Sequence, residues 1–162
     1  MTVALVPGIL VVMNIVYAAT SLPFGNLADR MNRRMLLAIG VGMLIVADIV
    51  LATAGTVWQV ALGAAIWGLH MGATQGLLSA LVADAVPSDL RATAFGLYGL
   101  ITGGALLAAS VLAGWLWTVL GPGATFTAGA GFAGLALIAI ISMRRPPAGD
   151  ELNVSDPVPG AE

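Results

Sequence analysis

Residues 25–34 read Gly25-Asn26-Leu27-Ala28-Asp29-Arg30-Met31-Asn32-Arg33-Arg34, and this stretch separates two long apolar segments. It holds half of the six basic residues of the chain. Charge packed this densely into a short loop between apolar segments is typical of the water-exposed end of a membrane helical hairpin. The stretch therefore predicts that the segments on both sides are transmembrane helices.

The composition points to a membrane protein and excludes several other classes. Of the 162 residues, 59% are hydrophobic and only 9% are charged, whereas a soluble domain carries about 25% charged residues. The absence of cysteine excludes disulfides, thiol catalysis and cysteine-ligated metals. A net charge of −2 offers no basic surface for nucleic acid. With one histidine and no pair of carboxylates inside a span, we expect no enzyme activity, no metal site and no cofactor.

Five segments are long enough to cross a hydrocarbon core of roughly 30 Å. They are residues 3–24, 35–53, 57–83, 93–117 and 124–143. Polar and apolar residues do not alternate along them, as they would in the strands of a transmembrane barrel. We therefore expect an all-α membrane protein with a bundle of five transmembrane helices over residues 1–145. Residues 146–162 are rich in proline, glycine and acid, which predicts a disordered cytoplasmic tail.

The basic residues all fall on one side of this predicted bundle. The first link, the third link and the stretch after the last span hold Arg30, Arg33, Arg34, Arg91, Arg144 and Arg145, and the second and fourth links hold none. The positive-inside rule places these arginines and the C-terminus in the cytoplasm and the N-terminus outside, and we expect a bacterial inner membrane. Because Met1-Thr2 carries no charge or signal that would export it, we also expect that preceding helices are missing.

Two stretches carry a resemblance to a known family. Gly25-x-Leu27-Ala28-Asp29-Arg30-x-Asn32-Arg33-Arg34-x-x-Leu37 resembles the signature loop of the major facilitator superfamily, which reads Gly-x-Leu-x-Asp-Arg-x-Gly-Arg-Arg/Lys. Val86-Pro87-x-x-x-Arg91-Ala92-Thr93-Ala94-Phe95-Gly96-Leu97-Tyr98 resembles the start of the family's eleventh helix, with alanine where glycine is more usual at position 92. Asn32 also replaces a usual glycine, and we expect it to adopt the same left-handed turn.

The resemblance implies the C-terminal half of such a transporter. The third span lacks the arginine, and the fourth span the Gly-Pro motif, that mark the corresponding helices of the N-terminal half. The chain thus resembles helices eight to twelve of twelve, a partial six-helix bundle. This implies a proton-coupled carrier that moves a small solute by alternating access, with the missing N-terminal half or another membrane chain as partner, and inactive alone. A small membrane scaffold without transport activity is the alternative.

The resemblance assigns a gating role to the signature loop. The residues concerned are Gly25, Asp29, Arg30, Arg33 and Arg34, together with Arg91. Either they latch neighbouring helices at the cytoplasmic face, or the arginines only anchor the loops in the cytoplasm. Arg91 either pairs with Asp84, Asp89 or the loop, or marks the inner side.

Polar residues inside the spans are candidates for a substrate or proton path, because burying them in a membrane is costly. They are Asn14, Tyr17, Asp48, His70 and Gln75. His70 either binds solute or relays a proton, or it is a neutral histidine bound to a neighbour. Asp48 either couples protons or reaches the outer interface. Gln75 is either a substrate contact or a link between helices.

Glycine spacing predicts close helix packing in two spans. Gly68, Gly72 and Gly76 recur every four residues, so they share one helix face with Gln75, roughly opposite His70. Gly99 and Gly103 repeat the spacing in the fourth span.

Overall fold

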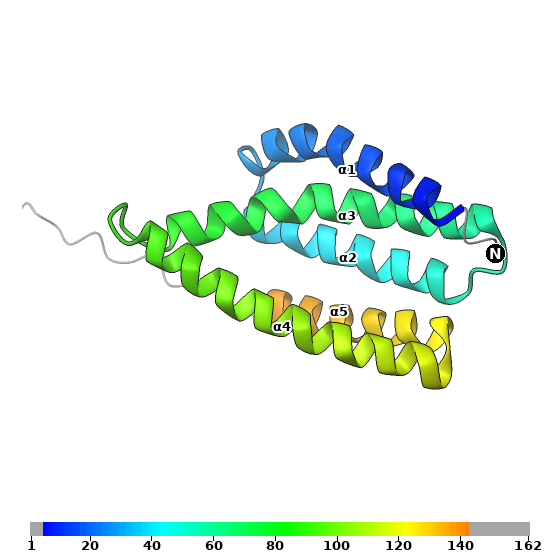
Figure 1. The fold of residues 1–162 in the computed structure, drawn as a ribbon. Helices are drawn as coiled ribbons and strands as arrows, with labels where there is room; N and C mark the ends of the chain where they lie inside the picture. Colours follow the sequence, from blue (N-terminus) through cyan, green and yellow to red (C-terminus); the bar gives the residue numbers. More distant parts are fainter. Residues whose placement is uncertain (1–4, 143–162) are drawn as a thin grey trace, which may run out of the picture.

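The computed structural model of the protein describes residues 5–142, which form five α-helices and no strand (Figure 1). The helices are α1 (Val6–Ala28), α2 (Arg33–Ala52), α3 (Val57–Asp84), α4 (Arg91–Leu120) and α5 (Pro122–Ser142). The predicted all-α membrane fold is confirmed, since α1, α2, α4 and α5 are each long and apolar enough to cross a membrane. Arg144, Arg145 and the predicted tail, residues 146–162, lie outside the described residues.

Side-chain caps explain where α2 and α3 begin. The amide N–H of Arg34 donates to the Asn32 side chain at 2.9 Å, which satisfies one of the free donors at the start of α2. At the start of α3, Thr56 and Gln59 form a reciprocal capping box. Glycine explains where α4 ends, because Gly121 has φ of 86° and Pro122 then begins α5.

The expected left-handed turn at Asn32 is wrong. Asn32 has φ of −62° and ψ of 114°, which is an extended conformation open to any residue. The reason for asparagine is its side-chain oxygen, which serves as the cap of α2. Glycine could reach the same backbone conformation but has no side chain to accept this hydrogen bond.

Short links make consecutive helices run in opposite directions. The links at residues 29–32 and 85–90 lie at one end of the bundle, and those at residues 53–56 and 121 lie at the other (Figure 1). The four arginines of the described chain, Arg30, Arg33, Arg34 and Arg91, are therefore gathered at one end.

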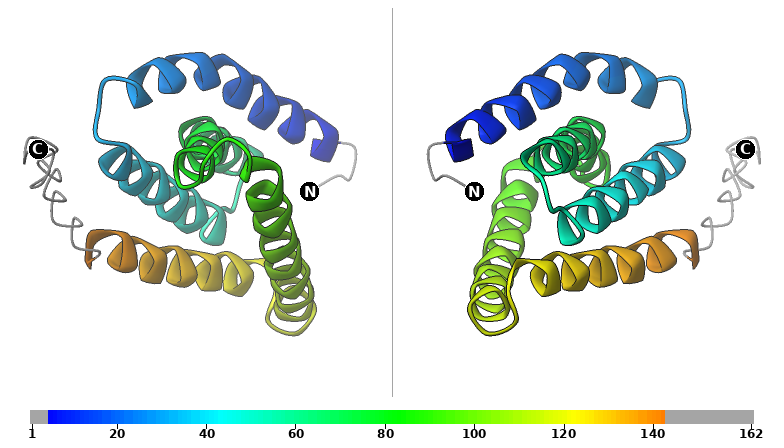
Figure 2. Two further views of the ribbon diagram at one scale, coloured as in Figure 1. Left: turned by 90° about the vertical axis from the view of Figure 1, so that its left-hand side faces the viewer. Right: turned by 90° about the vertical axis from the view of Figure 1, so that its right-hand side faces the viewer.

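Helix α3 occupies the middle of the arrangement. It packs against α1, α2 and α4, while α5 lies against α2 and α4 (Figure 2). Most of the buried residues come from α2 and α3, among them Leu36, Ala47 and Leu77, whereas α1 and α4 contribute none. Leu100 of α4 is 74% exposed, for example. Apolar side chains exposed in this way suit contact with lipid or with further helices.

The central position of α3 accounts for its composition. At 1.5 Å per residue, its 28 residues extend about 42 Å, but it is not among the four helices whose composition alone suits them to cross a membrane. Polar residues such as His70 and Thr74 lower its hydropathy. Neighbouring helices rather than lipid surround much of α3, so these residues meet protein partners instead of hydrocarbon.

Two glycines allow α1 and α3 to approach each other closely. A Cβ atom at Gly68 would collide with the backbone carbonyl oxygen of Met13, and one at Gly72 would collide with the Thr20 hydroxyl. Gly76, Gly99 and Gly103 have open space around them in the described chain. A packing role for these three glycines stays a prediction.

The start of α2 is tied to the end of α5 by Arg34. Its Nε donates to the Ile140 carbonyl at 2.6 Å, and one terminal nitrogen donates to the Ile141 carbonyl at 2.5 Å. The last four carbonyls of a helix have no partner within the helix. Arg34 therefore caps α5 from a position more than one hundred residues earlier in the chain.

We predict that Gly68→Ala destabilises the bundle relative to Gly76→Ala. Both variants gain helix propensity, but only the first forces a methyl group against the backbone of α1. Overpacking of this kind costs about 1–3 kcal/mol. Unfolding of the purified chain by SDS in mixed micelles, followed by circular dichroism, measures the difference. Equal midpoints for the two variants would contradict the contact.

We predict that Arg34→Lys lowers the free energy of unfolding by about 1 kcal/mol, the value of one hydrogen bond. Lysine keeps the charge but has no planar fork with which to bind two carbonyl groups together. Arg30→Lys is the matched control, since Arg30 makes no side-chain hydrogen bond of this kind within the described chain. The same unfolding assay applies, and an equal effect of both variants would contradict the capping role.

Candidate functional site

The signature loop is shorter than the sequence suggests. Helix α1 continues through Gly25 to Ala28, four residues beyond its expected end, and α2 begins at Arg33. Only residues 29–32 connect the two helices. Asp29 caps the end of α1, where its amide N–H donates to the Gly25 carbonyl.

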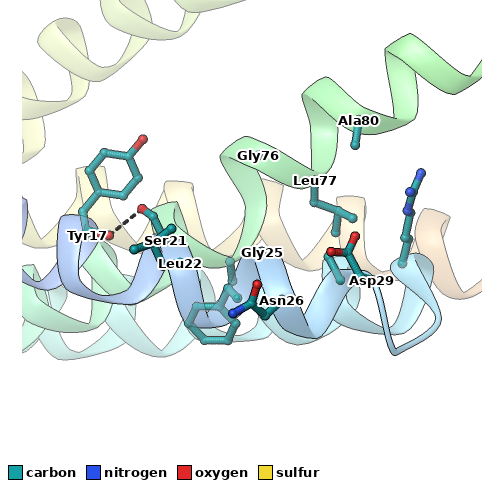
Figure 3. A pocket seen from close by; sticks show the side chains of 14 residues that line it. Tyr17, Ser21, Leu22, Gly25, Asn26, Asp29, Gly76, Leu77 and Ala80 are labelled. Atoms are coloured by element: carbon teal, nitrogen blue, oxygen red, sulfur yellow. Dashed lines mark hydrogen bonds between the residues drawn. The ribbon is translucent and has the colours of Figure 1, made fainter.

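A cavity of about 470 Å³ lies beside this loop, between α1 and α3 (Figure 3). We call it the loop cavity, and its lining includes Tyr17, Ser21, Asn26, Asp29, Arg33, Gly72 and Gly76. Two charged residues of the signature loop thus share a cavity with Tyr17, one of the predicted path residues. Asn14 is outside it, and its side chain donates to the Leu10 carbonyl of its own helix at 2.7 Å.

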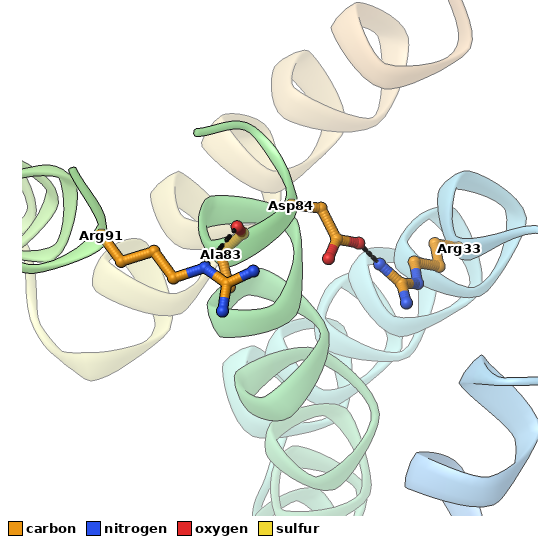
Figure 4. A network of polar contacts seen from close by, with 4 residues as sticks. All are labelled: Arg33, Ala83, Asp84 and Arg91. Carbon is orange, nitrogen blue, oxygen red and sulfur yellow. Dashed lines mark hydrogen bonds and ion pairs between the residues drawn. The ribbon is translucent and has the colours of Figure 1, made fainter. Parts of the chain in front are cut away.

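Arg33 forms an ion pair with Asp84 at the end of α3 (Figure 4). This pair joins the start of α2 to the end of α3. Its side chains are 36% and 58% exposed, and ion pairs at such positions are worth only about 0–1 kcal/mol. The ion pair therefore contributes little to the stability of the bundle.

Arg91 has a different partner from those expected. Its Nε donates to the Ala83 carbonyl at 3.3 Å, so it caps the end of α3 rather than pairing with a carboxylate (Figure 4). Asp84 is engaged by Arg33 instead, and Asp29 and Asp89 form no ion pair within residues 5–142. Both arginines thus act on the same end of α3.

A second cavity, of about 430 Å³, surrounds His70. We call it the histidine cavity, and it is lined by Leu37, Val41, His70, Thr74, Gln75, Leu78, Ser79, Tyr98 and Ile140. His70 Nδ1 lies 2.7 Å from the Gly40 carbonyl oxygen of α2. Because a carbonyl only accepts, Nδ1 carries the hydrogen, and Nε2 of a neutral ring is left as an acceptor.

Gln75 lies in the histidine cavity, whereas the helical periodicity predicts it on the glycine face. Gly72 and Gly76 line the loop cavity on the side of α1, and Gln75 lines the histidine cavity together with Tyr98 of α4. Gly72, Gln75 and Gly76, which helical periodicity places on one face of α3, therefore line two different cavities. Tyr98 and Gly40 were not expected at a site, because only the packing of α2 and α4 on α3 brings them there.

Asp48 is separate from both cavities. It is only 3% exposed, so the structure places it within the bundle rather than at an interface with water. It borders a third cavity, formed by α2, α3, α4 and α5. Of the predicted path residues, the structure thus brings together His70 and Gln75, but not Asp48 or Asn14.

Several known proteins are similar to the chain. Over 132 residues it is 34% identical to an uncharacterized MFS-type transporter of Methanocaldococcus jannaschii, covering 82% of this chain and 31% of that protein. It is 29% identical over 116 residues to an uncharacterized protein of Mycobacterium bovis, covering 72% and 28%. It is 33% identical over 90 residues to the class E tetracycline resistance protein of Escherichia coli, covering 56% and 22%.

The chain thus spans less than a third of the length of these curated relatives. No solved structure gives a significant match. The profile of the Major Facilitator Superfamily matches residues 1–159, which is nearly the whole chain. Together with the predicted signature loop and the apolar helices, this match shows that the chain is an integral membrane protein and belongs to the major facilitator superfamily of transporters.

Proposed function

We propose that the chain supplies the C-terminal helices of a secondary carrier that moves a small solute by alternating access, coupled to protons. The observation that carries the proposal is the histidine cavity. It places the only histidine of the chain on the central helix, in a cavity that also has amide and hydroxyl groups.

The chemistry of the histidine cavity suits a small polar solute. The Nδ1 hydrogen bond to Gly40 fixes the orientation of the His70 ring and leaves Nε2 to accept a hydrogen bond or a proton. Gln75, Ser79 and Tyr98 add donors and acceptors. A cavity of this size, with a few polar groups among apolar ones, is within the range of ligand sites.

The weak contacts at the arginine-rich end suit a gate. Alternating access requires the site to open to one side while it closes to the other. The exposed Arg33–Asp84 ion pair holds α2 and α3 together at this end, and it is weak enough to be broken when the loop cavity opens. The signature loop then acts as the latch that the family resemblance implies.

Further helices are needed for this mechanism. In alternating access, one repeat rocks against another around a central site, and five described helices do not form two repeats. Helices α1 and α4 present apolar faces without any buried residue. We propose that a longer parent protein or a second membrane chain supplies the helices that cover them, and that the chain is inactive alone.

A membrane scaffold without transport is the second candidate. The observation in its favour is the exposed apolar surface of α4, which suits docking against another helix. Capture of a specific membrane partner by cross-linking, without solute flux, would favour this alternative.

We predict that transport requires additional helices and His70. A chimaera in which the chain replaces the matching segment of the Methanocaldococcus jannaschii transporter should give solute-driven pH changes in liposomes with an entrapped pH dye. The solutes tested are tetracycline, a sugar, a dipeptide and a dicarboxylate. His70→Gln should lower the flux at least tenfold, because glutamine keeps a hydrogen-bond donor for Gly40 but cannot carry a proton.

Thr102→Ala is the control for His70→Gln. Thr102 bonds only to carbonyls of its own helix and does not line the cavities that contain Asp29, His70 and Asp48. Its flux should match that of the unaltered chimaera. Full flux in His70→Gln would contradict the assigned path, and flux by the 162-residue chain alone would contradict the need for more helices.

We also predict that the arginine-rich end faces the cytoplasm of a bacterial inner membrane. The chain has no cysteine, so single cysteines can be introduced directly. Gly55→Cys should react with an impermeant maleimide on intact cells, and Ser88→Cys only after the membrane is opened. Gly55 is preferable to Thr56, which is part of the capping box. The reverse labelling pattern would contradict the orientation.

A further inference from the structure

The third cavity, of about 470 Å³, lies among α2, α3, α4 and α5. Its lining residues on α2 and α4 belong to the halves of these helices that are remote from the arginines. We call it the aspartate cavity, and its walls are largely apolar. Its lining includes Asp48, Trp67, Ala113, Thr125, Phe126 and Gly129. It shares no lining residue with the histidine cavity. A ligand could therefore occupy it whether or not the histidine cavity carries a solute.

Asp48 is the only charged residue on these walls. Its carboxylate faces α5 at Gly129, where a Cβ atom would come within 2.8 Å of Oδ2. It makes no hydrogen bond or ion pair within residues 5–142. The nearby Thr125 hydroxyl does not bind Asp48, because it donates to the Gly121 carbonyl at 3.2 Å, four residues earlier in the chain. A residue that is only 3% exposed therefore borders the cavity without a partner in the described chain.

No arginine of the described chain can reach this carboxylate. Asp48 follows Arg34 by fourteen residues along α2, which at 1.5 Å per residue is about 21 Å. Arg91 begins α4, about 27 Å before that helix reaches the cavity at Ala109. An ionised carboxylate left alone in an apolar site is strongly unfavourable. A positive charge from outside the described chain would remove this cost.

The walls of the cavity indicate the kind of cation. Trp67 and Phe126 pack edge to face with ring centroids 6.3 Å apart, and Trp117 contacts Phe126 at 6.1 Å. Aromatic rings attract organic cations and also bury apolar groups. A metal ion needs several oxygen or nitrogen ligands, and no group of three such side chains occurs in the described residues.

We propose that the aspartate cavity binds an amphipathic organic cation, an ammonium or phosphonium group with an apolar body, whose charge pairs with Asp48. The apolar body lies against the aromatic and aliphatic walls. A side chain at position 129 would force the Asp48 carboxylate to move, since a Cβ atom there would lie 2.8 Å from Oδ2.

The test uses two probes of the same shape and opposite charge. Tetraphenylphosphonium and tetraphenylborate are applied separately to the purified 162-residue chain in a non-ionic detergent, and binding is measured by equilibrium dialysis. We expect saturable binding of the phosphonium only. Asp48→Asn should weaken it at least tenfold, whereas Asp89→Asn, which removes an exposed acid outside the cavity, should leave it unchanged.

A second variant tests the cavity itself. Ala113→Phe fills it from α4, a helix without buried residues that should tolerate the larger side chain, and it should also weaken binding at least tenfold. Phosphonium binding by Asp48→Asn or Ala113→Phe at the level of the unaltered chain would overturn the proposal. Equal binding of tetraphenylborate would overturn it too, because a purely apolar cavity does not distinguish the charges.

Discussion

The close approach of α1 to α3 at Gly68 and Gly72 is the contact on which the arrangement depends. Helix α1 packs chiefly against α3, and in lipid there is no hydrophobic force to press two apolar helices together. Their association must come from van der Waals contact, which requires the backbones to be near each other. The carbonyl of Met13 and the hydroxyl of Thr20 occupy the space that side chains at the two glycines would need.

The polar residues of α3 are accommodated by its other neighbours. Helices α2, α4 and α5 contribute residues to the cavity that holds His70 and Thr74, so these polar side chains meet protein rather than hydrocarbon. His70 bonds to the backbone of α2, and Thr74 donates to the His70 carbonyl at 2.9 Å. The same packing leaves cavities on both sides of α3. Glycine contact, polar content and cavities are thus consequences of the central position of one helix.

The sequence predicted the helices well and their contacts poorly, for a physical reason. Transmembrane segments can be predicted from the length of apolar stretches and the positions of arginine, which are local properties of the sequence. Helix α1 continues beyond the end of its predicted apolar span. A helix can extend into water, so neither the end of an apolar segment nor the start of a charged one marks where the helix ends. The Arg34 bonds to Ile140 and Ile141 could not be expected. They depend on where α5 lies, and no periodicity in the sequence contains that information.

Arg33 and Arg34, both in the first turn of α2, make two different kinds of contact. Arg33 reaches the end of α3 through an exposed ion pair, and Arg34 reaches the end of α5 through two hydrogen bonds to backbone carbonyls. An exposed ion pair contributes little, whereas each of the two hydrogen bonds from Arg34 contributes about 1 kcal/mol. Motion between α2 and α3 is therefore easier at this end than motion between α2 and α5. If this end of the bundle opens, α2 and α5 should move together as one unit against α3 and α1. The signature loop at residues 29–32 joins those two groups of helices, so it lies where such a movement must bend the chain.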